Sequence, residues 1–179
     1  MTADLEELIT GLVRDIPDFP KLGVVFKDIT PLLDDHVAFG AVVEALADVG
    51  RRDGEVVVDK VVGIEARGFI LAAPVALALG VGFIPVRKPG KLPAATLEVS
   101  YDLEYGSETL QIHEDAVAAG ERVLIVDDVL ATGGTAVAAR TLVEGAGGEV
   151  TGLAVLMELG FLEGRARTAD MPVTALHLV

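Results

Sequence analysis

The thirteen residues from Val123 to Thr135 read VLIVDDVLATGGT, and they decide the fold. The first four form a continuous apolar run, which is typical of a strand buried on both faces of a parallel sheet. Two adjacent carboxylates, Asp127 and Asp128, end this run at the carboxyl edge, where open α/β sheets bind their ligands. The small residues that follow predict a tight turn and then a helix beginning near Ala136.

The turn itself suits an anion, because its backbone N–H groups and the positive end of the helix dipole are free. It consists of Ala131, Thr132, Gly133, Gly134 and Thr135, so that two hydroxyls and two glycines allow close approach. An ordinary strand and helix joined by a capping threonine, with a solvated Asp pair, is the alternative. The complete order of strand, acid pair and turn favours a site for a phosphorylated sugar.

Outward from this stretch, strand and helix patterns alternate, which predicts βαβ units and a parallel sheet. The predicted helices cover residues 5–13, 35–49, 68–79 and 136–146, and the predicted strands cover 60–64, 82–86, 122–126, 150–156 and 173–179. Residues 17–23 read as a loop. Residues 94–112 break the alternation and predict a two-stranded excursion outside the main sheet, acting as a mobile flap.

Composition limits the class of protein. A chain of 179 residues fits one domain, 1–179, with a substantial core. Its apolar runs are too short for a membrane span, its acidic N-terminus is no secretory signal, and it has no cysteine. These features are compatible with a cytoplasmic protein. A net charge of −14 argues against binding to nucleic acid or to an acidic membrane.

The few cations are segregated rather than mixed. Residues 63–69, GIEARGF, place Glu65, Ala66 and Arg67 between a strand and a helix, where a guanidinium can grip phosphate oxygens. Residues 87–93, RKPGKLP, place Arg87, Lys88 and Lys91 around a Pro-Gly turn and suit a diphosphate. Solvated surface turns are the alternative for both. Residues 92–121 then hold seven acids and no Lys or Arg.

The stretch from Val123 to Thr135 resembles the phosphoribosyl-pyrophosphate (PRPP) motif of type I phosphoribosyltransferases. The resemblance implies their α/β fold, a central mostly parallel sheet flanked by helices, with a two-stranded flap and a small N-terminal hood (residues 1–34). It implies that Asp127 and Asp128 hold the ribose and that residues 131–135 hold the 5′-phosphate. It further implies pyrophosphate contacts from Glu65, Ala66, Arg67, Arg87, Lys88 and Lys91, with a cis bond between Glu65 and Ala66.

Four segments resemble the adenine subfamily of these transferases. They are PDFP (17–20) with VVFKDITP (24–31), RKPGKLP (87–93), SYDLEYG (100–106), and the run from Glu158 to Arg165. The resemblance implies a purine pocket formed by Val25, Phe26 and Lys27, with Leu159 covering the base. It also implies a flap carrying Tyr101 and Tyr105, with Glu104 as the acid–base group at N7 of adenine. The residues alone also allow a structural Phe26, and they do not separate Glu104 from Asp102 or Glu98.

The implied reaction joins adenine to PRPP and gives AMP and pyrophosphate. Mg²⁺ is the implied cofactor, held mainly by substrate oxygens with no direct protein metal site, and a homodimer is the implied assembly. One alternative is transfer to another base, such as xanthine, hypoxanthine or orotate. The other is a PRPP-sensing regulator, which the charge of −14 and the lack of a basic module disfavour.

Overall fold

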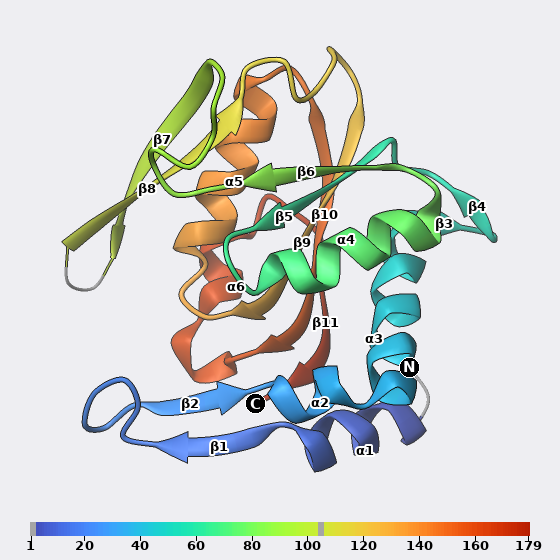
Figure 1. Ribbon diagram of the computed structural model, residues 1–179, viewed down its shortest axis with the longest axis vertical. Coiled ribbons are helices and arrows are strands. Elements are labelled where there is room, and N and C mark those ends of the chain that lie inside the picture. The colour runs from blue at the N-terminus through green and yellow to red at the C-terminus, as the bar shows by residue number, and fades with distance from the viewer. Residues whose placement is uncertain (1–2, 104–105) are drawn as a thin grey trace.

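The structure, a computed structural model, describes residues 3–103 and 106–179. Its centre is a five-stranded parallel sheet with the order β11-β10-β9-β5-β6 (Figure 1). The strands are β5 (Lys60–Ile64), β6 (Gly82–Val86), β9 (Arg122–Leu130), β10 (Glu149–Glu158) and β11 (Val173–Leu178). The predicted parallel α/β fold is therefore confirmed.

Strand β9 is longer than the predicted 122–126, and it contains both Asp127 and Asp128. The reason is its neighbour β10, which pairs with β9 as far as Leu130. On the other side, pairing with β5 stops at Val126. The prediction that the acid pair ends the strand is therefore wrong. The pair does lie beyond the end of β5, at the carboxyl edge of the sheet.

Helices cover both faces of the sheet, which explains why the central residues of its strands are mainly apolar. The main helices are α1 (Ala3–Leu12), α3 (His36–Ala47), α4 (Gly68–Leu79) and α5 (Gly134–Gly145). Alternate strand residues divide between two cores: Leu124 packs with α1, α3 and α4, and Ile125 packs with α5. The side chain of Asp35 caps α3 by accepting hydrogen bonds from two backbone N–H groups.

An N-terminal hairpin lies beside the carboxyl ends of the central strands (Figure 1). It consists of β1 (Arg14–Pro17) and β2 (Val25–Asp28), and α2 (Thr30–Asp34) follows it. The predicted loop, residues 17–23, connects these two strands apart from Pro17. The sequence analysis predicted no strand on either side of it, because these four-residue segments lack the alternation that marks a half-buried strand. The remaining short elements are η1 (Asp48–Gly50), β3 (Arg51–Arg52), β4 (Glu55–Val56), η2 (Gly160–Leu162) and α6 (Gly164–Arg167).

The predicted two-stranded excursion is present as an antiparallel hairpin of β7 (Thr96–Leu103) and β8 (Gly106–His113). It stands outside the main sheet and packs on α5 (Figure 1). Its inner face carries buried Leu110 and Ile112, and a backbone bridge joins Gln111 to Arg87 after β6. Within the described ranges, the structure has no helix both long and apolar enough to cross a membrane.

Candidate active site

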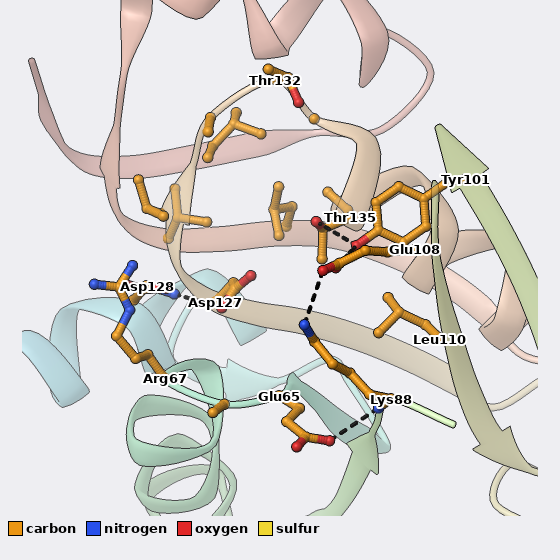
Figure 2. A pocket seen from close by; sticks show the side chains of 18 residues that line it. Glu65, Arg67, Lys88, Tyr101, Glu108, Leu110, Asp127, Asp128, Thr132 and Thr135 are labelled. Carbon is orange, nitrogen blue, oxygen red and sulfur yellow. Dashed lines mark hydrogen bonds and ion pairs between the residues drawn. The ribbon is translucent and has the colours of Figure 1, made fainter. Parts of the chain in front are cut away.

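A cavity of about 370 Å³ opens at the carboxyl edge of the sheet (Figure 2). Its walls come from the β5–α4 connection, the β9–α5 turn and the inner face of the β7–β8 hairpin. The polar residues that line it are Glu65, Arg67, Lys88, Tyr101, Glu108, Asp127, Asp128, Thr132 and Thr135. Segments far apart in the sequence thus meet where the sequence analysis expected a ligand.

The turn before α5 is shaped by Gly133, which has a φ of +82°. That left-handed conformation strongly favours glycine. A side chain is excluded as well, because a Cβ at this position would lie 2.7 Å from the carbonyl oxygen of Gly164 in α6. The turn therefore packs tightly on α6 and presents the first, unpaired N–H groups of a twelve-residue helix to the cavity.

The acid pair is joined to Arg67 at the cavity wall. Arg67 Nη2 lies 2.7 Å from Asp128 Oδ2, and the Asp128 side chain is only 6% exposed. The backbone N–H of Asp128 donates to Asp127 Oδ1 at 2.9 Å. Burial and the adjacent charge of Asp128 raise the pKa of Asp127 well above its ordinary value. Burial also raises the pKa of Asp128, although the Arg67 guanidinium opposes this shift.

Gly68, at the start of α4, lets this acid pair sit against the helix. A Cβ on Gly68 would lie 2.6 Å from Asp127 Oδ1 and 3.2 Å from the carbonyl oxygen of Val126. Both atoms belong to a strand buried in the sheet, so neither can move away easily. The glycine therefore fixes how closely the acid pair and the N-terminus of α4 approach each other.

Replacing Gly68 with alanine is expected to lower kcat/KM at least about tenfold, because displaced carboxylates no longer match a substrate bound in the cavity. Steady-state kinetics measure the effect. Gly40→Ala is the matched control, since Gly40 lies inside α3 and a Cβ there would have no atom within 4 Å. That control should keep full activity and gain slightly in thermal stability. Equal kinetics for both variants would contradict the prediction.

The predicted pyrophosphate residues separate into two groups. Glu65, Ala66, Arg67 and Lys88 line the cavity, and the Glu65–Ala66 bond is cis, as the resemblance implies. Arg87 and Lys91 are not among the described lining residues. Arg87 Nε instead donates to Glu65 Oε2 at 3.2 Å, and its Nη1 donates to the Lys91 carbonyl at 3.2 Å. The Arg87 guanidinium is therefore held between Glu65 and the backbone of Lys91 and does not line the cavity as described.

A second, smaller cavity of about 120 Å³ lies beside the first. It is lined by Val24, Val25, Phe26, Lys27, Arg67, Asp128, Val129, Met157 and Leu159. The Arg67 guanidinium carbon lies 4.8 Å from the centre of the Phe26 ring, and Phe19 packs edge-on against the same ring. The Lys27 ammonium is held 2.6 Å from Asp15, while the Lys27 carbonyl accepts from Arg67 Nη1 at 3.3 Å.

The two cavities share a wall. Arg67, Asp128 and Val129 line both of them. The structure therefore brings the predicted base residues, Val25, Phe26, Lys27 and Leu159, next to the predicted sugar and phosphate residues. A planar apolar group in the small cavity would lie beside a sugar at the acid pair, which is the arrangement needed to join a base to a ribose.

The predicted flap residues are only partly described. Glu104 and Tyr105 lie outside the described residues. Tyr101 does line the large cavity, where its hydroxyl lies 3.1 Å from Thr135 Oγ1. Glu98 is exposed on the outer face of the hairpin, and it accepts a hydrogen bond from the Gln111 side chain.

Glu108 is a cavity residue that the sequence analysis did not select. Its carboxylate accepts from Lys88 Nζ at 3.0 Å and from the Tyr101 hydroxyl at 3.1 Å (Figure 2). The Lys88 ammonium lowers the pKa of Glu108, and Glu108 in turn raises the pKa of Lys88. Strand alternation was the available signal, because residue 108 shares a face with buried Leu110 and Ile112.

The parallel sheet, with a glycine turn after its central strand and two adjoining cavities at its carboxyl edge, is the arrangement of a type I phosphoribosyltransferase. Comparison with known proteins agrees: residues 32–173 match the model of the phosphoribosyl transferase domain family. Adenine phosphoribosyltransferase from Nocardioides sp. is 63% identical over 170 residues, which cover 94% of this chain and 92% of that protein. The chain belongs to the adenine phosphoribosyltransferase family, whose activity is a pentosyl transfer of purine salvage.

Solved structures of relatives have the same fold. Adenine phosphoribosyltransferase from Thermoanaerobacter pseudethanolicus is 52% identical, with a TM-score of 0.91 over 98% of this chain and 99% of that chain. The Saccharomyces cerevisiae enzyme is 38% identical, with a TM-score of 0.89 over 98% of this chain and 99% of that chain. The latter structure is complexed with adenine and an imino-altritol bisphosphate.

Proposed function

We propose that this chain transfers the phosphoribosyl group of PRPP to N9 of adenine, giving AMP and pyrophosphate. The wall shared by the two cavities is the observation that carries the proposal, since it sets a base pocket against a site for a phosphorylated sugar. Adenine in the yeast relative's structure supports the choice of base. The test is AMP formation from adenine, PRPP and Mg²⁺. A folded sample without turnover would contradict the proposal.

The described residues support particular roles in the large cavity. Residues 131–135 would bind the 5′-phosphate through backbone N–H groups and the hydroxyls of Thr132 and Thr135. Asp127 and Asp128 would accept hydrogen bonds from the ribose hydroxyls. Arg67 and Lys88 are the cations that line the cavity, and they would stabilise the charge that grows on the departing pyrophosphate. Catalysis would rest on positioning and on this electrostatic stabilisation.

The small cavity would hold the adenine ring between apolar groups, with Phe26 stacking on one side and Leu159 covering the base. Stacking accepts any purine, so the choice of base must come from hydrogen-bonding groups on the backbone of residues 25–27. Because the Lys27 ammonium is paired with Asp15, we propose that Lys27 contacts the base through its backbone. In a competition assay, we expect adenine to be used at least about 100-fold better than hypoxanthine or xanthine. A preference for a 6-oxopurine would instead support the alternative base.

Glu104 is proposed as the acid–base group at N7 of adenine, and Tyr105 as a flap residue that helps enclose the substrates. Residues 94–112 would close over the cavity and exclude water, which would otherwise hydrolyse PRPP. Glu104→Gln is expected to lower kcat more than it weakens PRPP binding, because N7 loses its proton only as the new bond forms. Single-turnover kinetics with a PRPP titration test this. An unchanged rate would remove Glu104 from the role.

Mg²⁺ is the proposed cofactor, and the donor set fits this assignment. The described residues contain no cluster of three or more acids or histidines that could hold a metal alone. Asp127 and Asp128 offer carboxylate oxygens, which Mg²⁺ prefers, while substrate phosphates would supply most of its ligands. When bound, the ion would neutralise charge on the diphosphate.

A homodimer is the proposed assembly, and helix α4 supports it. Every residue of GFILAAPVALAL is apolar, although Leu77 is 81% exposed and Ile70 is also exposed. A helix that is apolar on all sides is normally buried. Arg87, which packs on Phe69 of this helix, would lie near that interface.

We further propose that residues 1–179 form one domain, in which residues 1–34 are a hood over the base pocket. We also propose a cytoplasmic location.

A further inference from the structure

The Glu108 carboxylate binds two groups that we expect to bind the anionic substrate, the Lys88 ammonium and the Tyr101 hydroxyl. Glu108 Oε1 lies 3.0 Å from the Lys88 ammonium, and Glu108 Oε2 lies 3.1 Å from the Tyr101 hydroxyl. Tyr101 continues the chain of contacts to Thr135 Oγ1, on the turn proposed for the 5′-phosphate. Figure 2 shows the Glu108 carboxylate between the ammonium and the hydroxyl, inside the cavity. The carboxylate thus connects the pyrophosphate side of the cavity with the 5′-phosphate side.

The ion pair between Lys88 and Glu108 is exposed enough to be exchanged for another partner. The Lys88 and Glu108 side chains are 50% and 36% exposed, and ion pairs at such exposure contribute little to folding. A phosphate oxygen would offer Lys88 more charge than a carboxylate does. A bound pyrophosphate would also lie near Glu108, and like charges in a partly enclosed cavity repel each other.

We propose that Glu108 is an internal substitute for the substrate anion: it holds Lys88 and Tyr101 in place in the free protein and is displaced when PRPP or pyrophosphate binds. This inference rests on the proposed function. It makes Glu108 a positioning residue that acts through Lys88, and it predicts that the carboxylate weakens anion binding.

The test compares Glu108→Gln with the wild-type protein. The amide keeps the shape of the side chain and can still accept a hydrogen bond, but it lacks the charge. We expect the Kd for Mg²⁺-pyrophosphate, measured by isothermal titration calorimetry, to fall by about three- to tenfold. The KM for PRPP should fall by a similar factor while kcat does not rise, since tighter ground-state binding does not lower the barrier.

Glu98→Gln is the matched control. Glu98 lies on the same hairpin and loses the same charge, but it is exposed on the outer face and bonded to Gln111. Its Kd should stay within about twofold of the wild-type value, as expected for a screened surface charge. In a Lys88→Met background, Glu108→Gln should lower the Kd by a smaller factor, because the ammonium for which the two anions compete is gone.

An unchanged Kd in Glu108→Gln would overturn the inference and leave Glu108 a structural anchor of the hairpin. A higher Kd would also overturn the inference, since Glu108 would then position Lys88 for the ligand instead of competing with the ligand. Glu108→Ala gives a second measurement if the glutamine variant has a lowered melting temperature. Pyrophosphate titration needs no turnover, whereas AMP formation by the wild-type protein tests the proposed function separately.

Discussion

Replacing Arg67 with glutamine is expected to lower kcat/KM at least about 100-fold, the largest effect that we predict for a single cation in the site. Arg67 lines both cavities, stacks on Phe26 and pairs with Asp128. Its loss removes a charge from the proposed pyrophosphate site and a wall from the base pocket at the same time. Lysine should not rescue the activity, because it cannot reproduce the planar, bidentate guanidinium.

The same variant should also lower the free energy of unfolding, by about 2 kcal/mol, because a buried carboxylate loses its partner. The value is moderate since Arg67 itself is 35% exposed. Chemical denaturation measures it. Adding Asp128→Asn should restore stability but not activity. Arg140→Gln is the control, since it breaks only a surface pair with Glu144 and should change stability by less than about 0.5 kcal/mol. Recovery of activity in the double variant would contradict the assignment of Arg67.

Replacing Asp127 with asparagine is expected to lower kcat/KM about 100-fold while making the free protein more stable. In the proposed site the carboxylate accepts a hydrogen bond from a ribose hydroxyl, so its loss would remove substrate positioning. In the free protein, however, it lies beside Asp128 and is poorly solvated. Removing its charge should raise the free energy of unfolding by about 1 kcal/mol, or about 2–4 °C in Tm.

The raised pKa of Asp127 determines how the stability gain of the asparagine variant changes with pH. The folded-state pKa of Asp127 is raised, so between the ordinary pKa of 3.8 and the folded value the folded state binds more protons than the unfolded state. Stability from this group is therefore present at low pH and is lost as pH rises through the folded pKa. The Tm advantage of Asp127→Asn should grow in the same direction, which calorimetry on the ligand-free protein can follow. A constant or shrinking difference would contradict it.

Parts of the fold were predictable because their signals are local. Strand β5 and helix α4 match the predicted bounds, since β5 is a short run of mainly apolar residues and α4 is a twelve-residue apolar stretch that ends before Gly80. The predicted end of β9 was wrong, because the end depends on where β10 and β5 stop pairing with this strand. The residues of β9 themselves give no signal of that position. The β1–β2 hairpin was missed for a similar reason: its strands are short, and their pairing lies in tertiary contacts.

The site shows the same division. It was predictable that the turn of residues 131–135 and the acid pair would line one cavity, because they are close together in the sequence. The division of the cations was not, since the contacts of Arg87 with Glu65 and with the Lys91 carbonyl depend on how two loops fold against each other. Glu108 was missed because one acid among seven in an acidic segment carries no motif. Only the inward face of the strand distinguishes it.

The shared wall of Arg67, Asp128 and Val129 also bears on how such a protein can change over evolutionary time. On one side lies the cavity proposed for the sugar and its phosphates, which is lined by the sheet edge and helix termini. On the other lies a pocket whose remaining residues come mainly from β2 and the end of β10. Under the proposed function, substitutions in that hairpin would alter which base is accepted while the other cavity keeps its donor substrate, so new specificities could arise by changes in a peripheral segment.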